Sequence, residues 1–270
     1  MDSMKVYREM DVITAKPSRS RRSEVPYHLI DIVDPDVEFS VAEYLPLLER
    51  ALGEVESRGR RAVIVGGTAL YLKGFLDGFR TGPAADWSLR NKFFEEAKVV
   101  GPEGLHERLR QIDAVSAQKI HPKDLRRTVR ALEVLETTGR PLSEGWQWGE
   151  KAPAGIKVFG LERRRAELYA RIDRRVEAMV AEGLFEEAER LMARNPPLSR
   201  SASQAIGYKE GCEGLSTSRS RTEIVARIQQ STRQFAKRQL TWFRKLPLEW
   251  IQASEGHDSG EIARQILERG

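Results

Sequence analysis

A short apolar run that ends in two glycines and a threonine constrains the fold of this chain more than any other feature. Residues 61–65 have the composition of a buried strand, and Gly66, Gly67 and Thr68 lead from it into a helical pattern. A second apolar run, at 156–161, follows only after several long helical patterns. Short apolar runs that alternate with long helices are typical of a parallel sheet flanked by helices. We therefore predict an α/β fold.

A long helical stretch interrupts this α/β pattern. Residues 88–138 contain helical patterns without a convincing strand, with a Gly-Pro break at 101–102 and a glycine stop at Gly139. We predict an all-helical insertion domain at 88–138. The α/β core, with its C-terminal helices, is then expected to comprise 1–87 and 139–270.

Local signals place several helices of the core. A capping box at Ser40 satisfies free N–H groups at a helix start, and the helix should run until Gly59. Two further helices, at 165–183 and 184–194, are expected to break at Gly183.

The predicted helix at 222–245 has two distinct faces. With about 100° per residue, four apolar residues share one stripe: Ile224, Ile228, Phe235 and Trp242. Three basic residues lie roughly opposite: Arg233, Lys237 and Arg244. We expect the apolar stripe to pack into the core and the basic stripe to meet phosphates. A second basic cluster lies at 119–130; both clusters suit a polyanionic partner, and a solvated helix face is the alternative.

Bulk properties indicate a soluble, cytoplasmic protein. The 270 residues carry a net charge of +5, and no apolar stretch is long enough to cross a bilayer. We see no signal peptide, and the single Cys212 cannot form an internal disulfide. The four histidines are scattered without metal-ligand spacing, so we predict no metal site built from protein side chains.

The glycine turn has two interpretations. Gly66 and Gly67 would let a ligand approach the backbone at a helix start, where free N–H groups attract anions. Thr68 could cap that helix or donate its hydroxyl to a bound group. The alternative is a tight strand–helix turn with no ligand.

Two sets of arginines also have two interpretations each. Asp124, Arg127 and Arg130 share a helix face, either as a local ion pair of little energetic consequence or as guanidinium groups that face RNA. Arg171 and Arg175 share another face. Directed inward they could stabilise a diphosphate, and directed outward they are surface charge.

Five short motifs complete the pattern. They read Asp-Ser-Met-Lys-Val-Tyr at 2–7, Thr-Ala-Lys-Pro at 14–17, Gly-Gly-Thr at 66–68, Ala-Ile-Gly-Tyr-Lys-Glu at 205–210, and Thr-Arg-Gln-Phe-Ala-Lys-Arg-Gln-Leu-Thr-Trp-Phe-Arg at 232–244. In this order they resemble the tRNA dimethylallyltransferases, from Asp2 to about Trp250. The resemblance implies a P-loop-NTPase-like parallel sheet flanked by helices, with a helical insert.

The family's activity follows from the same resemblance. Its members transfer a dimethylallyl group from dimethylallyl diphosphate to N6 of the adenosine 3′ of the anticodon, in tRNAs that read codons beginning with U. The product is N6-(dimethylallyl)adenosine. The implied partners are the tRNA anticodon stem-loop and dimethylallyl diphosphate, with Mg²⁺ as cofactor, no membrane, and a monomeric enzyme.

Roles for individual residues are carried over by motif. Asp2 resembles the general base that takes a proton from the adenine amine. Arg175 matches the group that stabilises the leaving diphosphate. The implied tRNA-binding residues are Asp2, Ser3, Met4, Lys5, Thr68, Arg90, Arg126, Arg127, Arg130, Gln204, Ala205, Ile206, Gly207, Tyr208 and Lys209.

The chain departs from the family pattern near its start. Family members carry, before the position of Asp2, a strand and a loop of the form G-x-T-x-S-G-K-[ST] that binds the diphosphate and helps place Mg²⁺. We expect a chain that lacks this first strand and P-loop, is N-terminally truncated, and transfers weakly or not at all; neighbouring strands should be exposed. Lys5 stands where Gln is common, and Glu9 and Ile13 replace glycines. Ile13 should resist a turn that needs positive φ.

Two alternatives to this enzyme follow. The first is a tRNA-binding protein without catalysis, derived from the enzyme. The second is a related isopentenyltransferase that acts on free adenine nucleotides. The long basic helix and the helical insert favour a macromolecular acceptor over a free nucleotide.

Overall fold

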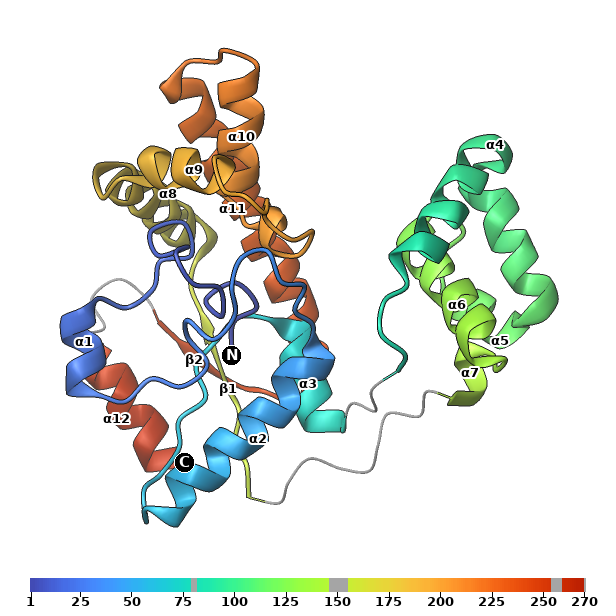
Figure 1. Ribbon diagram of the computed structural model, residues 1–270. Coiled ribbons are helices and arrows are strands. Elements are labelled where there is room, and N and C mark those ends of the chain that lie inside the picture. Colours follow the sequence, from blue (N-terminus) through green and yellow to red (C-terminus); the bar gives the residue numbers. More distant parts are fainter. Residues whose placement is uncertain (79–81, 146–154, 254–258, 270) are drawn as a thin grey trace. The chain divides into compact units, whose positions relative to one another are not determined.

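The computed structural model describes residues 1–78, 82–145, 155–253 and 259–269 (Figure 1). The chain divides into two compact units: Met1–Leu76 with Ala152–Gly270, and Asp77–Lys151. Helices of the first unit are α1 (Arg19–Glu24), α2 (Val41–Ser57), α3 (Ala69–Asp77, whose last residue falls in the second unit), α8 (Arg165–Ala181), α9 (Leu184–Met192), the short 3-10 helix η1 (Ala202–Gln204), α10 (Tyr208–Ser216), α11 (Arg221–Phe243) and α12 (Ser259–Arg269). Helices of the second unit are α4 (Trp87–Ile112), α5 (Ala114–Lys119), α6 (Leu125–Thr138) and α7 (Leu142–Gly145).

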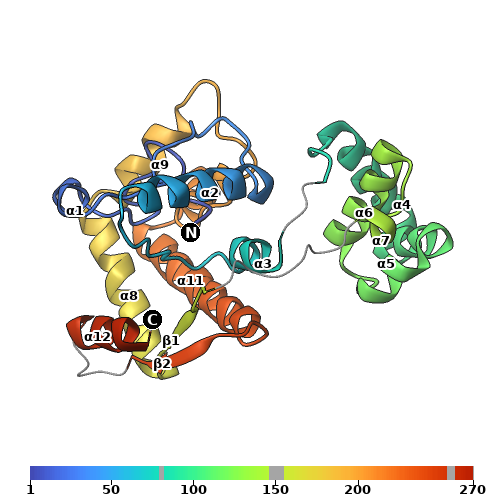
Figure 2. The same cartoon turned by 90° about the horizontal axis from the view of Figure 1, so that it is seen from below.

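A small parallel sheet lies in the first unit. β1 (Phe159–Glu162) pairs in parallel with β2 (Glu249–Gln252), which comes directly after α11 in the chain. Ile251 of β2 and Ile262 of α12 are buried together, so α12 lies beside the sheet (Figures 1 and 2). The fold is therefore a mostly helical α/β fold with a small parallel sheet, in agreement with the predicted class.

Only one of the two predicted strands is present. The strand expected at 156–161 is found, slightly displaced, as β1. The prediction of a strand at 61–65 is wrong, because these residues form no strand. Val63 and Val65 are 72% and 76% exposed. In the described part of the chain, no backbone hydrogen bond joins 61–64 to another segment. A strand of a parallel sheet is normally covered on both faces, and nothing described covers these valines.

Helix boundaries follow their local signals closely. Ser40 precedes α2, and its backbone N–H donates to the Glu43 carboxylate at 2.8 Å. Gly183 separates α8 from α9 with a φ of 98°, a left-handed conformation that favours glycine. In the second unit Gly101 bends α4 at a φ of 77°, and Gly139 ends α6 at a φ of 68°.

The stripe on α11 that was expected to be apolar core is buried only in its first half. Ile224 and Ile228 are almost fully buried, whereas Phe235 and Trp242 are 40% and 37% exposed. The prediction of core packing is therefore wrong for the two aromatic residues. The physical reason is that α10 covers α11 only near its start, where Ile224 lies against Gly214.

Three tyrosines form the centre of the first unit. Tyr7 and Tyr44 are fully or almost fully buried, and the ring centroids of Tyr44 and Tyr71 lie 4.6 Å apart. Burial, with the nearby Asp2 carboxylate, raises the pKa of Tyr44 to about 12. These phenols therefore stay neutral near pH 7 and serve as packing and hydrogen-bonding groups behind the N-terminal turn.

A buried carboxylate holds the N-terminal loop. Glu187 of α9 is 2% exposed and accepts three consecutive backbone N–H groups, from Asp11 at 3.0 Å, Val12 at 2.9 Å and Ile13 at 2.9 Å. Because these donors are satisfied by a side chain, the loop needs no strand or helix of its own. Sequence analysis did not single out Glu187.

The two unusual residues of this loop differ in their backbone strain. Ile13 does not adopt positive φ, so the expected conflict with its β-branched side chain is absent. Glu9 does adopt it, with a φ of 62°, and its carboxylate pairs with Arg194 at 2.6 Å. Of these two positions, only Glu9 has the backbone conformation that favours glycine.

Replacement Glu187→Ala should lower the free energy of unfolding of the first unit by about 2 kcal/mol or more, because one buried and two partly buried N–H groups lose their acceptor, at about 1–3 kcal/mol for a fully buried group. Urea unfolding followed by fluorescence measures the change. The control is Glu186→Ala, whose side chain is 55% exposed and lies 3.7 Å from Arg221; it should change stability by less than about 1 kcal/mol. Equal effects of the two substitutions would contradict the role assigned to Glu187.

Candidate functional site

The Asp2 carboxylate is fixed by its own turn. Its Oδ1 accepts the backbone N–H groups of Met4 at 2.9 Å and Lys5 at 3.2 Å. The side chain is half-buried in front of the tyrosine cluster. One carboxylate oxygen is thereby anchored in a site from which a carboxylate can accept a proton.

The glycine turn lies directly beside this segment. Gly67 N–H donates to the Met1 carbonyl at 3.2 Å, and a Cβ at Gly66 would lie 1.7 Å from that same oxygen. The Thr68 hydroxyl accepts from the Ser3 backbone N–H at 3.1 Å. The close approach that glycines permit is therefore made here by the protein's own backbone, and Thr68 joins the turn to the segment that carries Asp2.

Basic side chains gather near Asp2. Burial lowers the pKa of Lys5; Asp2 opposes that shift, and the guanidinium groups of Arg175 and Arg22 add to it. The charges of both Asp2 and Arg175 thus act on Lys5, although Arg175 comes from α8. Arg175 and Arg171 are both exposed on that helix. This cluster suits an anionic ligand beside a carboxylate.

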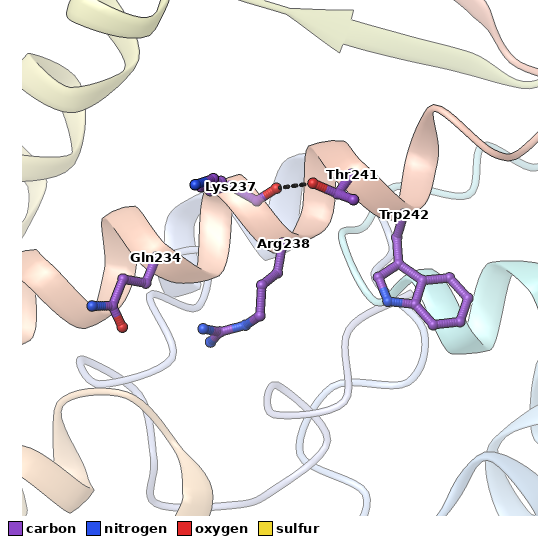
Figure 3. Close-up of a pocket in the computed structure, with 5 residues that line it drawn as sticks. All are labelled: Gln234, Lys237, Arg238, Thr241 and Trp242. Atoms are coloured by element: carbon purple, nitrogen blue, oxygen red, sulfur yellow. Dashed lines mark hydrogen bonds between the residues drawn. The ribbon is translucent and has the colours of Figure 1, made fainter. Parts of the chain in front are cut away.

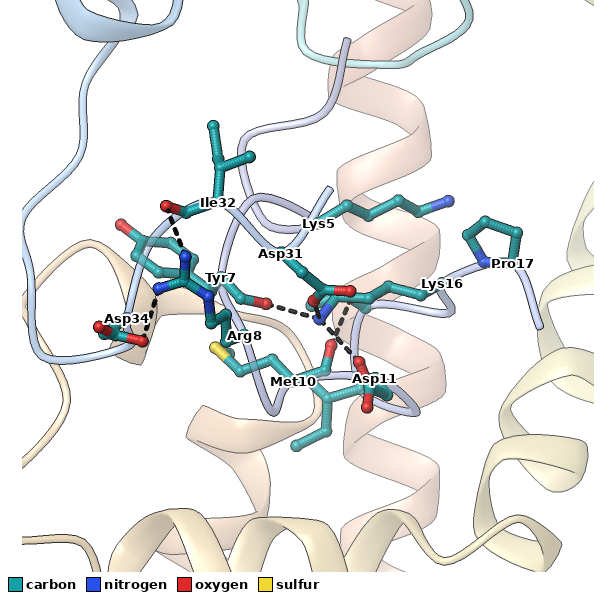
Figure 4. A network of polar contacts seen from close by, with 12 residues as sticks. Lys5, Tyr7, Arg8, Met10, Asp11, Lys16, Pro17, Asp31, Ile32 and Asp34 are labelled. Carbon is teal, nitrogen blue, oxygen red and sulfur yellow. Dashed lines mark hydrogen bonds and ion pairs between the residues drawn. The ribbon is translucent and has the colours of Figure 1, made fainter. Parts of the chain in front are cut away.

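The Lys16 ammonium group connects the motif at 14–17 with the motif at 2–7 (Figure 4). Its side chain is 1% exposed, and its Nζ contacts the Tyr7 carbonyl at 2.5 Å, Asp11 at 2.7 Å and Asp31 at 2.5 Å. Asp31 also pairs with Arg22 at 2.5 Å. Because protein acceptors already surround Lys16, its role is to fix the loop that bears Asp2. Lys5 extends past this network in Figure 4 with no dashed contact.

The segment 204–209 offers few side chains to a partner. Ala205 and Gly207 are buried, and Gly207 adopts a φ of 103° with its N–H donating to Glu210 at 2.8 Å. Gln204 and Lys209 are the exposed members of the segment. The predicted binding strip therefore presents two side chains on a rigid turn, while Ile206 and Tyr208 are half-buried.

The exposed half of α11 carries a shallow pocket of about 390 Å³ (Figure 3). Its lining comprises Gln234, Lys237, Arg238, Thr241 and Trp242. The basic stripe is only partly available, since Arg233 pairs with Asp173, and Arg244 with Glu162 at 2.8 Å. Cations and an exposed indole on one surface suit phosphates and unpaired bases.

The remaining predicted residues lie in the second unit. Arg127 lies 3.3 Å from Asp124, which also caps α6, so these two residues form a local ion pair. Arg126 is exposed. Arg90 and Arg130 contact the same buried carboxylate, that of Glu133, at 2.9 and 2.6 Å. Sequence reasoning missed Glu133, although its spacing of three residues from Arg130 on a helix is a recognised pairing signal.

The described residues form neither a cluster of metal-binding side chains nor a helix that could span a membrane. No group of three or more His, Cys, Asp or Glu side chains gathers there in a metal-binding arrangement. No described helix combines the length and the apolar character needed to cross a membrane.

Comparisons with known proteins agree with the motifs and the fold. The model of the family described as IPP transferase matches residues 5–246. A tRNA dimethylallyltransferase of Geobacter sulfurreducens is 44% identical over 261 residues, which cover 96% of this chain and 84% of that protein. The full-length tRNA isopentenylpyrophosphate transferase of Bacillus halodurans has a TM-score of 0.69 at 36% identity, covering 99% of this chain and 84% of the other.

The crystal structure of a eukaryotic dimethylallyltransferase acting on tRNA is also similar to this structure, with a TM-score of 0.79 at 26% identity. The match covers 98% of this chain and 70% of that one. The relatives and the family model therefore define an enzyme of the prenyl-transferring class. The chain belongs to the IPP transferase family.

Replacement Asp31→Asn should reveal a pH-dependent contribution to stability. Burial raises the pKa of Asp31, but hydrogen bonds from Lys16 and Arg22 lower it more, so the folded pKa lies below the unfolded one. The carboxylate then stabilises the fold above about pH 4 and loses this effect as the pH falls through its lower folded pKa.

The free energy of unfolding of the wild type minus that of Asp31→Asn should accordingly be large at pH 7 and shrink as the pH falls below about 4. Urea titrations across this range measure it. Asp34→Asn is the control, since its exposed ion pair with Arg8 contributes little. A difference for Asp31→Asn that does not vary with pH would contradict the assignment.

Proposed function

We propose that this chain transfers a dimethylallyl group from dimethylallyl diphosphate to N6 of the adenosine 3′ of the anticodon. The tRNAs would be those that read codons beginning with U, and the product N6-(dimethylallyl)adenosine. The observation that carries the proposal is the 44% identity to a tRNA dimethylallyltransferase over 96% of the chain. The anchored Asp2 carboxylate beside Lys5 and Arg175 supports it.

The proposed chemistry uses these three side chains. The adenine N6 forms a bond to the first carbon of the dimethylallyl group as that carbon's bond to the diphosphate oxygen breaks. Asp2 accepts the proton that N6 loses, which is the task of a general base. Arg175 and Lys5 would face the diphosphate as its negative charge develops, because positioned cations stabilise a leaving anion.

Magnesium fits this site only through the substrate. Proteins usually hold Mg²⁺ with substrate phosphates and one or two carboxylates, and the described residues offer no larger acidic cluster. We propose that Mg²⁺ accompanies the diphosphate, where it would neutralise phosphate charge.

Binding of the anticodon stem-loop is proposed for surfaces of both units. In the first unit, Lys209 and the α11 surface with Lys237, Arg238 and Trp242 would meet the RNA. The target base must leave its stack to reach Asp2, and an aromatic or guanidinium platform offsets that cost by about 1–3 kcal/mol per stacked base. In the second unit, the predicted insert at 88–138 would supply its arginines. We further propose a monomer that works in the cytoplasm.

A tRNA-binding protein without catalysis is the second candidate. It is favoured by the exposure of Arg175, because a guanidinium group in water stabilises a leaving diphosphate less than one in a site that excludes water. On the same ground we propose that transfer by these 270 residues is slow. The cations near Asp2 would then be a remnant of a diphosphate site, and tRNA binding would still fall steeply with salt.

The activity test combines the chain with dimethylallyl diphosphate, Mg²⁺ and unmodified tRNA, and seeks one added dimethylallyl group on adenosine by mass spectrometry. We expect slow but measurable transfer, which Asp2→Asn abolishes while the Kd for tRNA changes less than about threefold, because Asp2 acts on a proton and not on phosphates. Asp34→Asn, an exposed carboxylate of the same unit, should transfer at the wild-type rate.

Each result separates the proposals. Equal rates for Asp2→Asn and wild type would remove Asp2 from the role of base. Rapid transfer by the wild type would refute the expected impairment. Salt-sensitive tRNA binding without any transfer would favour the non-catalytic candidate.

A further inference from the structure

One buried carboxylate in the second unit holds two arginine side chains from different helices. Glu133 of α6 is 0% exposed. Its Oε2 lies 2.9 Å from Arg90 Nη2 of α4 and 2.6 Å from Arg130 Nη1 of α6, and its Oε1 accepts the Asp86 backbone N–H at 2.6 Å. Two cations therefore share one carboxylate.

Each guanidinium group is also held at a second point. Arg130 Nη2 donates to the Pro83 carbonyl at 2.8 Å. Arg90 lies over the Trp87 ring, 4.7 Å from its centroid. With two points of attachment, a planar guanidinium group has one orientation, and less rotamer freedom remains to be lost when a ligand binds.

These arginines nevertheless reach the surface. The side chains of Arg90 and Arg130 are 20% and 27% exposed, in contrast to the fully buried carboxylate that they contact. The arrangement is a rigid pair of guanidinium edges with the compensating charge placed behind them. Such a pair can recognise the shape of an RNA loop, whereas a flexible lysine supplies only a point charge.

We infer that Glu133 is a positioning residue that fixes Arg90 and Arg130 for the anticodon stem-loop and thereby determines RNA specificity. The inference rests on the proposed function, which makes these arginines RNA contacts. A carboxylate near an RNA surface repels phosphates, so it lowers the affinity for every RNA. Its benefit is confined to an RNA that needs the fixed geometry of both arginines.

Removal of the negative charge therefore has opposite effects on two RNAs. Glu133→Gln adds one net positive charge, which strengthens binding to any RNA at low salt. It also frees the two guanidinium groups, which weakens binding only to the RNA they are arranged to recognise. A purely structural role of Glu133 would instead weaken both RNAs alike or neither.

The test measures the Kd of the whole chain, by fluorescence anisotropy, for two RNA hairpins of equal length. One is the anticodon stem-loop of a tRNA that reads a codon beginning with U, and the other is an unrelated hairpin. For Glu133→Gln we expect the Kd of the stem-loop to rise about tenfold, a loss of about 1.4 kcal/mol. The Kd of the unrelated hairpin should stay the same or fall.

A matched control lies on the same helix. Glu136→Gln makes the identical change at a carboxylate that is 48% exposed and only 3.4 Å from Arg108. It should leave the ratio of the two Kd values unchanged. Arg90→Lys provides a second variant that keeps the charge but lacks the planar fork. It should lower the ratio of the Kd for the unrelated hairpin to the Kd for the stem-loop, even if Glu133→Gln fails to fold.

The outcomes distinguish this inference from the proposed function. If the wild type does not prefer the anticodon stem-loop, the proposed function fails, and the inference fails with it. If the wild type prefers the stem-loop and both variants retain that preference, or weaken the two hairpins equally, the inference alone is overturned.

Discussion

Buried carboxylates hold together the parts of this protein that regular secondary structure does not. Glu187 satisfies three consecutive backbone N–H groups of the N-terminal loop, and the buried Lys16 ammonium joins that loop to Asp31. Without these contacts the loop would bury unpaired polar groups, each at a cost comparable to a lost hydrogen bond. The position of Asp2 depends on this arrangement, because the loop packs behind the turn that carries it.

Pairing decides which cations remain for a ligand. Arg233, Arg244 and Lys16 already contact carboxylates, whereas Lys5 interacts with other cations as well as with Asp2. A basic composition alone would have treated all of them alike. The site proposed for the diphosphate is therefore defined less by where positive residues are most numerous than by where their charge is least neutralised.

The sequence predicts local features of this fold much better than its long-range ones. The break at Gly183, the stop at Gly139 and the start at Ser40 depend on nearby residues, and all three are found. The exposure of Phe235 and Trp242 depends on how far α10 extends along α11, and the apolar period of a helix carries no such information.

The candidate site shows the same division. Motifs identified Asp2, Thr68 and Arg175, and the structure places Thr68 against Ser3 and Arg175 near Lys5. Sequence reasoning did not identify Glu187 and Glu133, because the sequence does not distinguish a buried glutamate from an exposed one. Only the fold shows which glutamate faces backbone N–H groups or arginines from another helix.

The exposure of residues 61–65 affects how the protein behaves in solution. Val63 and Val65 face solvent, and the backbone groups of residues 61–64 have no described hydrogen-bond partner, whereas the Val65 carbonyl accepts from the Met1 amino group. A stretch of this kind is a template on which another polypeptide can add as a strand. Solutions of the 270-residue chain should therefore become turbid as the protein and salt concentrations rise. Val63→Lys should delay the onset of turbidity.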